Sequence, residues 1–361
     1  MNIRKILTPF NILLLLSAAA LIMQICFVLI PDFADFFNSA IAHYPRVFLA
    51  KLTGIFPFSI AEIMLFSLVP LSIVAAIRLN KAEQSVKKRI IKLLRGALCI
   101  VLSIFILYVT TFSAGYHTET LDKKLDLEDH KISREELYSA LIYAVEKTND
   151  YAEKINYTDS GASKMPFDYK TLSKDISENY KEILQSHSLG DGYSSRIKPL
   201  IISPVMTYTH ISGVYSFFTG EANLNTNYPD YVCVFSTAHE MAHQRGFARE
   251  NEANFMAFLI CSESDNDYVA YSGWLSIYTY LSSAMRQADA ELYREVYSML
   301  CDGAKGELIS YSKFFDKYRY STASKISDAV NDTYLKAQGT EGTRSYGMVV
   351  DLAVSYINTL A

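Results

Sequence analysis

Three long apolar runs mark the first third of the chain. Residues 12–30 and 96–114 contain no charged side chain, and residues 57–77 contain only one, Glu62. A helix needs about 20 consecutive apolar residues to cross a bilayer. The pattern therefore predicts three transmembrane helices, at about 12–30, 57–77 and 96–114, in a membrane domain that comprises residues 1–115.

The first apolar run has a second interpretation. Arg4 and Lys5 precede it and Ala18–Ala20 lies within it, a combination that resembles a secretory signal with its cleavage site. The run continues past the alanines to membrane-spanning length, which favours a retained helix. Whether this span is cleaved stays open at the level of the sequence.

Lysine and arginine are distributed unevenly around the three runs. The N-terminus carries Arg4 and Lys5, whereas the loop between the first two runs carries only Arg46 and Lys51. The loop between the second and third runs carries Arg78, Lys81, Lys87, Lys88, Arg89, Lys92 and Arg95. Because basic loops stay in the cytoplasm, the N-terminus is expected there and residues 116–361 are expected outside the membrane.

Residues 116–361 have the mixed polar and apolar pattern of a water-exposed domain. Apolar positions recur with helical spacing through most of it. The predicted helices include those at about 171–186, 232–246, 249–263, 268–286, 288–300, 309–318, 323–338 and 345–360. A small β element is expected between them, with a short buried strand at 199–203. The chain is thus predicted to be mainly α.

The composition of the 361 residues narrows the classes of partner. The chain is 50% hydrophobic and 20% charged, with a formal net charge of −4. A chain without an excess of positive charge does not suggest nucleic acid. Its five cysteines are widely spaced and odd in number, which fits free thiols rather than a disulfide framework. The expected partners are a lipid bilayer and a peptide or protein outside it.

The candidate chemistry lies in the predicted helix at 232–246. Residues 239–243 read H-E-M-A-H, the pattern H-E-x-x-H. Two histidines four residues apart lie on one face of a helix and can bind one metal ion. We expect His239 and His243 to bind a single Zn²⁺. Glu240 is expected to act as general base toward a water that the ion makes more acidic.

A third metal ligand is expected from the helix that follows. Glu250 and Glu252 both lie at its start. Glu250 shares a face with small residues such as Ala257, which would let this helix approach the motif helix, whereas Glu252 shares a face with bulkier ones such as Phe255. This favours Glu250 as the ligand, with Glu252 as the alternative. Asn254, one turn after Glu250, could orient a histidine ligand.

Two further side chains near the motif could take part. Arg249 could bind a substrate carboxylate or an oxyanion, although pairing with a neighbouring glutamate is the simpler interpretation. His210 could stabilise a transition state, although a lone histidine in a loop rich in tyrosine and threonine is more often structural.

Several segments resemble an uncharacterised family of bacterial membrane proteins, a domain of unknown function. Those around the motif are residues 218–223 (F-T-G-E-A-N), 238–247 (A-H-E-M-A-H-Q-R-G-F) and 250–255 (E-N-E-A-N-F). Residues 271–274 and 345–347 resemble later segments of that family. The resemblance implies three N-terminal spans and a zincin-like domain outside the membrane, without implying a particular substrate.

The ligand set is similar to that of the glutamate zincins, the gluzincins. Metzincins place a third ligand three residues after the glycine that corresponds to Gly246, and this chain has Arg249 there. Glu250 suits a gluzincin better, although its spacing from the motif is shorter than usual. In zincins an edge strand beside the motif helix commonly holds the substrate. Residues 218–225, which include Glu221, would take that role here.

These observations predict a multi-pass protein of the bacterial cytoplasmic membrane that acts outside it as a zinc-dependent metallopeptidase. One Zn²⁺ per chain is expected, and the substrate would be a peptide or protein. Two alternatives share the same site. One is a non-catalytic, zinc-stabilised binding or scaffold protein, and the other is an amidase acting on cell-wall peptides. The sequence does not separate these three.

Overall fold

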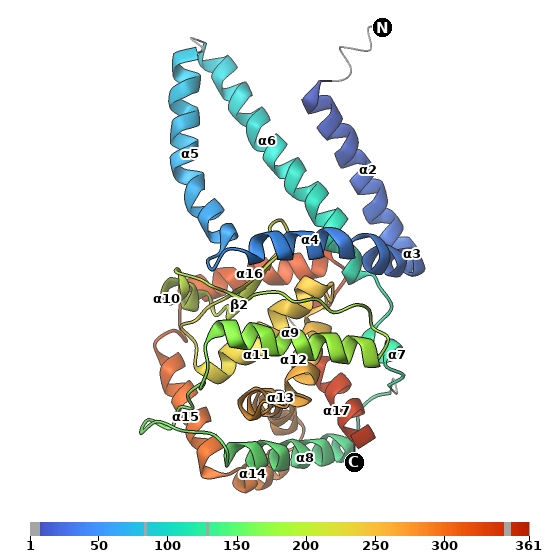
Figure 1. The fold of residues 1–361 in the computed structure, drawn as a ribbon, viewed down its shortest axis with the longest axis vertical. Coiled ribbons are helices and arrows are strands. Elements are labelled where there is room, and N and C mark those ends of the chain that lie inside the picture. Colours follow the sequence, from blue (N-terminus) through green and yellow to red (C-terminus); the bar gives the residue numbers. More distant parts are fainter. Residues whose placement is uncertain (1–7, 83–84, 128–129, 343–347, 361) are drawn as a thin grey trace. The chain divides into compact units, whose positions relative to one another are not determined.

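The computed structural model describes residues 8–82, 85–127, 130–342 and 348–360 (Figure 1). The chain divides into two compact units. The membrane unit comprises the residues up to Thr118 together with Ser216–Glu221, and the C-terminal unit comprises Glu119–Tyr215 and the residues from Ala222 onward. The sequence suggested a boundary near residue 115 and gave no sign that Ser216–Glu221 joins the membrane unit.

The membrane unit contains three helices that are long and apolar enough to cross a membrane. They are α2 (Pro9–Leu29), α5 (Ile60–Ala82) and α6 (Val86–Thr111), so the prediction of three N-terminal membrane helices is confirmed. Helix α6 begins well before the predicted residue 96, because the lysines and arginines of the basic loop are good helix formers and extend it. Arg4 and Lys5 lie outside the described residues.

The connection between the first two spans is helical and not an open loop. It contains α3 (Pro31–Phe36), the π-helical turn η1 (Phe37–Ile41) and α4 (His43–Gly54). A 3-10 turn, η2 (Ser113–Tyr116), follows α6. Within this unit, α2 and α6 pack along each other.

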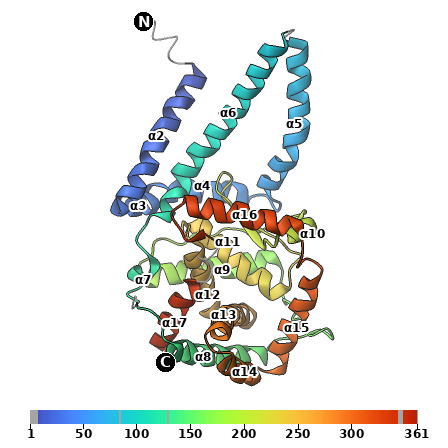
Figure 2. The same ribbon diagram turned by 180° about the vertical axis from the view of Figure 1, so that it is seen from behind.

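The C-terminal unit is mostly helical, with α13 (Asp267–Ala288) as its central helix. Helix α13 packs against α8 (Arg134–Ala152), α11 (Asp230–Arg245) and α12 (Glu250–Ser262) (Figure 1). The other helices, some of which are clearer from behind (Figure 2), are α7 (Leu121–Lys124), α9 (Tyr169–Ser186), α10 (Ser203–Met206), η3 (Thr207–Thr209), α14 (Ala290–Met299), α15 (Asp302–Asp316), α16 (Thr322–Ala337) and α17 (Val349–Leu360). The prediction of a mainly α chain is therefore confirmed.

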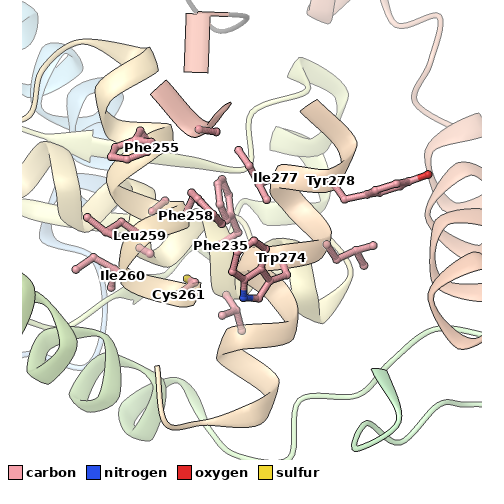
Figure 3. Close-up of a cluster of buried hydrophobic side chains, with 14 of the residues drawn as sticks. Phe235, Phe255, Phe258, Leu259, Ile260, Cys261, Trp274, Ile277 and Tyr278 are labelled. Atoms are coloured by element: carbon pink, nitrogen blue, oxygen red, sulfur yellow. The ribbon is translucent and has the colours of Figure 1, made fainter. Parts of the chain in front are cut away.

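The core of the C-terminal unit is centred on α12 and α13. Every side chain from Glu252 to Ser262 is buried. Phe258 of α12 meets the indole of Trp274 of α13 edge to face, with ring centroids 5.0 Å apart (Figure 3). A Cβ at Gly273 would lie 2.6 Å from the Cβ of Cys261, so the glycine allows these two helices to approach closely. Dense packing on all sides holds α12, and with it the turn that carries its first residues.

Three short strands form the predicted β element. They are β1 (Lys198–Pro199), β2 (Gly213–Ser216) and β3 (Glu221–Leu224), in the order β1-β3-β2, with β1 and β3 parallel. The predicted strand at 199–203 is wrong beyond Pro199, because Ile201 is 79% exposed and helix α10 follows. Pro204 has the fixed φ that suits the first turn of a helix, which explains the early end of the strand.

The expected substrate-holding edge strand at residues 218–225 is also wrong. Strand β3, which falls in this range, is the central strand, because β1 lies on one side of it and β2 on the other. The edge strand on the other side of β3 is β2.

The connection between β2 and β3 belongs to the membrane unit. There, Phe217 packs edge to face on Tyr108 of α6, with ring centroids 5.4 Å apart. Gly220 has a φ of 68°, and a Cβ at this position would lie 2.5 Å from the Cβ of Leu49 in α4. Glycine is therefore required at residue 220 both by its backbone conformation and by the close approach of α4.

Candidate metal centre

Helix α11 presents the two histidines of the motif in the same direction. Its apolar residues Val234, Ala238 and Met241 are fully buried in the core of the C-terminal unit, which fixes the rotation of the helix about its axis. His239 and His243 lie one turn apart, with ring centroids separated by 4.7 Å. The sequence expectation of one shared face is thus realised in the structure.

Gly246 ends α11 and turns the chain toward α12. Its φ of 99° and ψ of 8° lie in the left-handed region that favours glycine. The N–H of Gly246 donates to the carbonyl oxygen of His243 at 3.0 Å, and that of Phe247 to the carbonyl oxygen of Ala242 at 3.2 Å. These bonds satisfy carbonyls at the end of α11. The short turn returns the chain so that Glu250, the first residue of α12, lies beside the two histidines.

The carboxylate of Glu250 approaches both imidazoles. Its Oε2 lies 3.3 Å from Nε2 of His239 and 3.6 Å from Nε2 of His243. In the part of the chain that the structure describes, this is the group of side chains that could hold a metal ion, with its ligand atoms within 4.8 Å of one another. Ligands 2.0–2.1 Å from a tetrahedral ion lie roughly 3.3 Å apart. The two distances from the Glu250 oxygen to the imidazole nitrogens are close to this spacing.

A backbone contact fixes the tautomer of His243. Its Nδ1 lies 2.8 Å from the carbonyl oxygen of Phe247 and must donate, because a carbonyl oxygen can only accept. In the neutral imidazole the proton then sits on Nδ1, and Nε2 keeps its lone pair toward Glu250. Metal-binding histidines are commonly oriented by such a bond from the other ring nitrogen. His243 has this orienting bond, whereas Nδ1 of His239 is buried without a hydrogen-bond partner among the described residues.

Burial and mutual charge set the protonation of this group. Burial by itself would lower the pKa of His243, but the Glu250 carboxylate outweighs it and raises that pKa to about 9. Burial would likewise raise the pKa of Glu250, yet the two imidazoles hold it far below its usual range. The three side chains form a buried, charge-coupled cluster, an arrangement in which a bound cation can replace a shared proton.

Glu240 is buried beside strand β2. A Cβ at Gly213 would lie 2.5 Å from Cγ of Glu240 and 2.6 Å from its Oε1, so only glycine fits there without a shift. Burial raises the pKa of Glu240 to about 6, although His239, His243 and a hydrogen bond from the Tyr215 backbone oppose the rise. The carboxyl group is thus held between the motif helix and the edge strand, with a pKa close to neutrality.

Glu252 occupies a separate site on the other side of the α12 N-terminus. Its Oε1 accepts hydrogen bonds from Nη1 of Arg249 at 2.6 Å and from the backbone N–H of Leu121 at 3.0 Å. Burial raises the pKa of Glu252, and the Arg249 guanidinium opposes that rise. Glu252 therefore holds the segment that enters the C-terminal unit, and Arg249 pairs with it instead of facing an open site. The structure brings Glu250, and not Glu252, to the histidines.

The other candidate side chains have different surroundings. Nε2 of His210 donates to the carbonyl oxygen of Tyr318 at 2.8 Å, and its ring packs on Phe315. Asn254 is buried one turn after Glu250, and its Nδ2 has no hydrogen-bond partner among the described residues. His210 does not belong to the group of converging ligand atoms.

Glu221 also has a structural role. It belongs to the membrane unit, where its carboxylate accepts the backbone N–H groups of Ile60 and Ala61 at 3.0 and 2.8 Å. These are unpaired donors at the N-terminus of α5, where a negative charge is stabilising. Glu221 thus caps a membrane helix, which differs from the substrate-binding role expected from the sequence.

Two residues near the site were missed at the level of the sequence. Gly213 lies 27 positions before Glu240, and only the sheet brings the two together. Tyr280 of α13 lies close enough to Glu250 for that carboxylate to add to the effect of burial, which raises the pKa of the Tyr280 phenol. Among 26 tyrosines nothing in the sequence singles out this one.

The chain matches a protein family of unknown function. The family described as "Protein of unknown function (DUF3810)" matches residues 37–354, which cover most of the chain and all of the candidate metal centre. No curated protein and no solved structure matches the chain. The three apolar N-terminal helices fit the membrane-protein family that the sequence resembles. The chain belongs to this family, DUF3810.

Proposed function

We propose that the protein is a membrane-anchored, zinc-dependent metallopeptidase. The observation that carries the proposal is the convergence of His239, His243 and Glu250 on one point, with Glu240 in the same helix turn as the first histidine. Two nitrogen ligands and one carboxylate leave the fourth position of a tetrahedral ion open, as in catalytic zinc sites. A purely structural site is usually closed by four protein ligands, so this donor set favours catalysis over a scaffold role.

His239, His243 and Glu250 would hold the ion. When bound, zinc acidifies a water molecule and polarises the carbonyl group of a substrate. Glu240 would accept a proton from the attacking water and deliver it to the leaving amine. Burial of the Glu240 side chain keeps this carboxylate out of bulk water, and the close fit of Gly213 limits the positions that it can adopt.

Strand β2 is the element best suited to hold an extended substrate. It is an edge strand, and Gly213 at its start touches Glu240. An extended peptide that lies along a sheet edge is recognised mainly through its main chain. Because Gly213 of β2 lies beside the proposed general base, a peptide lying along this strand would pass the residues of the candidate metal centre. The substrate class that follows is an extended segment of polypeptide.

We further propose that the C-terminal unit lies outside the cytoplasmic membrane of a bacterium, with the N-terminus in the cytoplasm. The lysines and arginines at the end of α5 and the start of α6 support this orientation. A membrane-impermeant maleimide should label Asp191→Cys, in an exposed segment of the C-terminal unit, on intact cells. It should label Lys87→Cys, in the basic first turn of α6, only after the membrane is opened. The reverse pattern would contradict the orientation.

The activity is tested with the full-length protein in detergent, loaded with zinc and incubated with a peptide library that includes cell-wall peptides. Mass spectrometry should find products in which one amide bond has gained one water. Glu240→Gln keeps the shape of the side chain and the three ligands, so it should keep the zinc and lose the cleavage. Zinc binding without any cleavage by the wild type would instead indicate the non-catalytic alternative. Cleavage that survives in Glu240→Gln would contradict the mechanism.

A further inference from the structure

Helix α4 of the membrane unit has an exposed apolar face. Tyr44, Phe48 and Leu52 are 71%, 64% and 46% exposed, and they follow one another at intervals of four residues. Ile41, just before the helix, and Ile55, just after it, extend the same stripe and are also exposed. A contiguous row of large apolar side chains in contact with water is unfavourable, and it marks a surface that meets another apolar phase.

The opposite face of α4 is packed within the membrane unit. Arg46, Ala50 and Thr53 on that face are buried. A charged residue and small residues therefore point inward, whereas the large apolar residues point outward. A helix at a water-exposed surface has the reverse arrangement, with its apolar face buried and its polar face exposed. The exposed stripe is thus not the surface by which α4 attaches to its own unit.

Arg46 fixes the direction in which the apolar stripe points. It is 1% exposed, and its Nη1 donates to Oδ1 of Asn38 at 2.8 Å and to the carbonyl oxygen of Thr111 at 3.0 Å. Its Nη2 donates to the carbonyl oxygen of Asn38 at 2.8 Å. Thr111 is the last residue of α6, so the guanidinium also meets the negative end of that helix. These bonds hold α4 against α6 and prevent rotation about its axis.

Both ends of the segment that contains α4 are attached to the same membrane surface. Helix α2 ends at Leu29, and α5 begins at Ile60 and runs in the opposite direction (Figure 1). A chain that leaves one span and enters the next must stay near the surface that the two spans share. Figure 1 and Figure 2 show α4 running across the ends of the membrane helices and not along them. The nearest apolar phase for its exposed face is therefore the bilayer itself.

We infer that α4 is an interfacial helix, whose face of Tyr44, Phe48 and Leu52 is inserted into the lipid layer beside the ends of the membrane spans. Such helices lie roughly 5–10 Å deep, at the boundary of headgroups and acyl chains. Tyrosine is favoured at this depth because it has an apolar ring and a polar tip. Lys51, at the edge of the stripe, can extend its ammonium group to the headgroups. The inference concerns the membrane unit and does not depend on the proposed peptidase activity.

The test adds a tryptophan at Phe48 in the full-length protein, reconstituted in phosphatidylcholine vesicles. The parent chain has one tryptophan, Trp274, which is buried in the C-terminal unit, so the emission added by Phe48→Trp is the difference between the two proteins. Bromine atoms on lipid chains quench indole on contact. We expect most of the added emission to be lost with bromines near the glycerol end of the acyl chains. The loss should be clearly smaller with bromines near the chain ends.

Three further variants make the result decisive. Tyr44→Trp should repeat the result on the same face and replaces Phe48→Trp if that variant does not fold. Leu21→Trp, exposed near the middle of α2, should show the opposite depth preference. Arg294→Trp, exposed on α14 in the C-terminal unit, should be quenched by acrylamide in the water and by neither lipid.

Two outcomes would overturn the inference. If acrylamide quenches the tryptophan at residue 48 and brominated lipid does not, the face of α4 lies in water. If neither quenches it, protein covers the face, either a second copy of the chain or another part of the same chain.

Discussion

The Nδ1–H group of His243 donates to the carbonyl oxygen of Phe247 at 2.8 Å. Phe247 also donates its own N–H to the carbonyl oxygen of Ala242, which closes the end of α11. One residue thus takes part both in ending the motif helix and in orienting a candidate metal ligand. The left-handed conformation of Gly246 makes this double role possible, because it turns the Phe247 carbonyl back toward the histidine.

Gly246→Ala should weaken both the fold and the metal site. A side chain at a φ of 99° costs about 1 kcal/mol, and relief of that strain would move the Phe247 carbonyl away from His243. Loss of such an orienting contact typically lowers metal affinity roughly 10–100-fold. Zinc titration against a competing chelator measures the affinity, and chemical unfolding followed by Trp274 emission measures the stability of the C-terminal unit.

Gly339→Ala is the matched control for this effect. Gly339 also has a positive φ, 84°, and nothing lies within 4 Å of the position of its added Cβ. This variant should lose similar stability and keep full zinc affinity. Equal zinc affinities for Gly246→Ala and Gly339→Ala would show that the turn has no part in orienting His243.

Substitution of each of the two glutamates at the start of α12 by glutamine should affect a different property of the protein. Glu250→Gln removes the oxygen that both imidazoles approach and should lower zinc affinity by more than the roughly 10–100-fold caused by changes outside the ligand set. Glu252→Gln should keep the zinc and destabilise the C-terminal unit by about 1–3 kcal/mol, because it weakens the bonds with Arg249 and Leu121. Metal analysis of the purified variants, with unfolding curves, separates the two effects. Zinc loss in Glu252→Gln alone would reverse the assignment.

The motif and its neighbours could be predicted from the sequence because their geometry is local. Helical spacing alone brings His239 and His243 together, and the short turn at Gly246 brings Glu250 back to them. The preference for Glu250 over Glu252 agrees with the structure, but the packing is not quite as the sequence suggested. Cys261, which shares a helix face with Glu250 and Ala257, packs closely on Gly273 of α13.

Features that depend on contacts distant in the sequence could not be predicted in the same way. Glu221 lies next to residues of the predicted substrate strand, yet its carboxylate caps α5, about 160 residues earlier in the chain. Gly213 becomes informative only when the sheet places it against Glu240. The hydrophobic pattern did not predict α4 either, because its apolar stripe contains too few residues for a membrane span and its inward face carries Arg46.

Gly213→Ala should impair catalysis without affecting the metal, if the proposed activity is correct. The added methyl group would displace the Glu240 carboxyl group, whose Oε1 would otherwise lie 2.6 Å from it. A general base typically increases the reaction rate roughly 10²–10⁴-fold. Partial misplacement of the Glu240 carboxyl group should therefore lower kcat roughly 10–100-fold. Gly306→Ala, whose added Cβ would make only ordinary contacts at 3.5 Å, is the control. A kcat unchanged by Gly213→Ala would mean that Glu240 does not need its present position.

Glu307 of α15 should make the stability of the C-terminal unit depend on pH. It is fully buried, its Oε2 accepts the backbone N–H of Ser163 at 2.8 Å, and its Oε1 has no hydrogen-bond partner among the described residues. Burial raises its pKa from 4.5 to about 7, although the hydrogen bonds from Ser163 oppose the rise. The folded state therefore binds a proton more tightly than the unfolded state does.

The sign of this effect follows from proton binding. Below about pH 4.5 Glu307 is protonated in both the folded and the unfolded state. Its full contribution to the free energy of unfolding is then present. As the pH rises toward 7 the unfolded chain releases the proton first, so the free energy of unfolding falls by about 3 kcal/mol relative to a variant that cannot ionise. Glu307→Gln should remove this loss, and urea unfolding followed by Trp274 emission between pH 4.5 and 8 measures it. Parallel curves for the wild type and Glu307→Gln would mean that Glu307 ionises equally easily in both states.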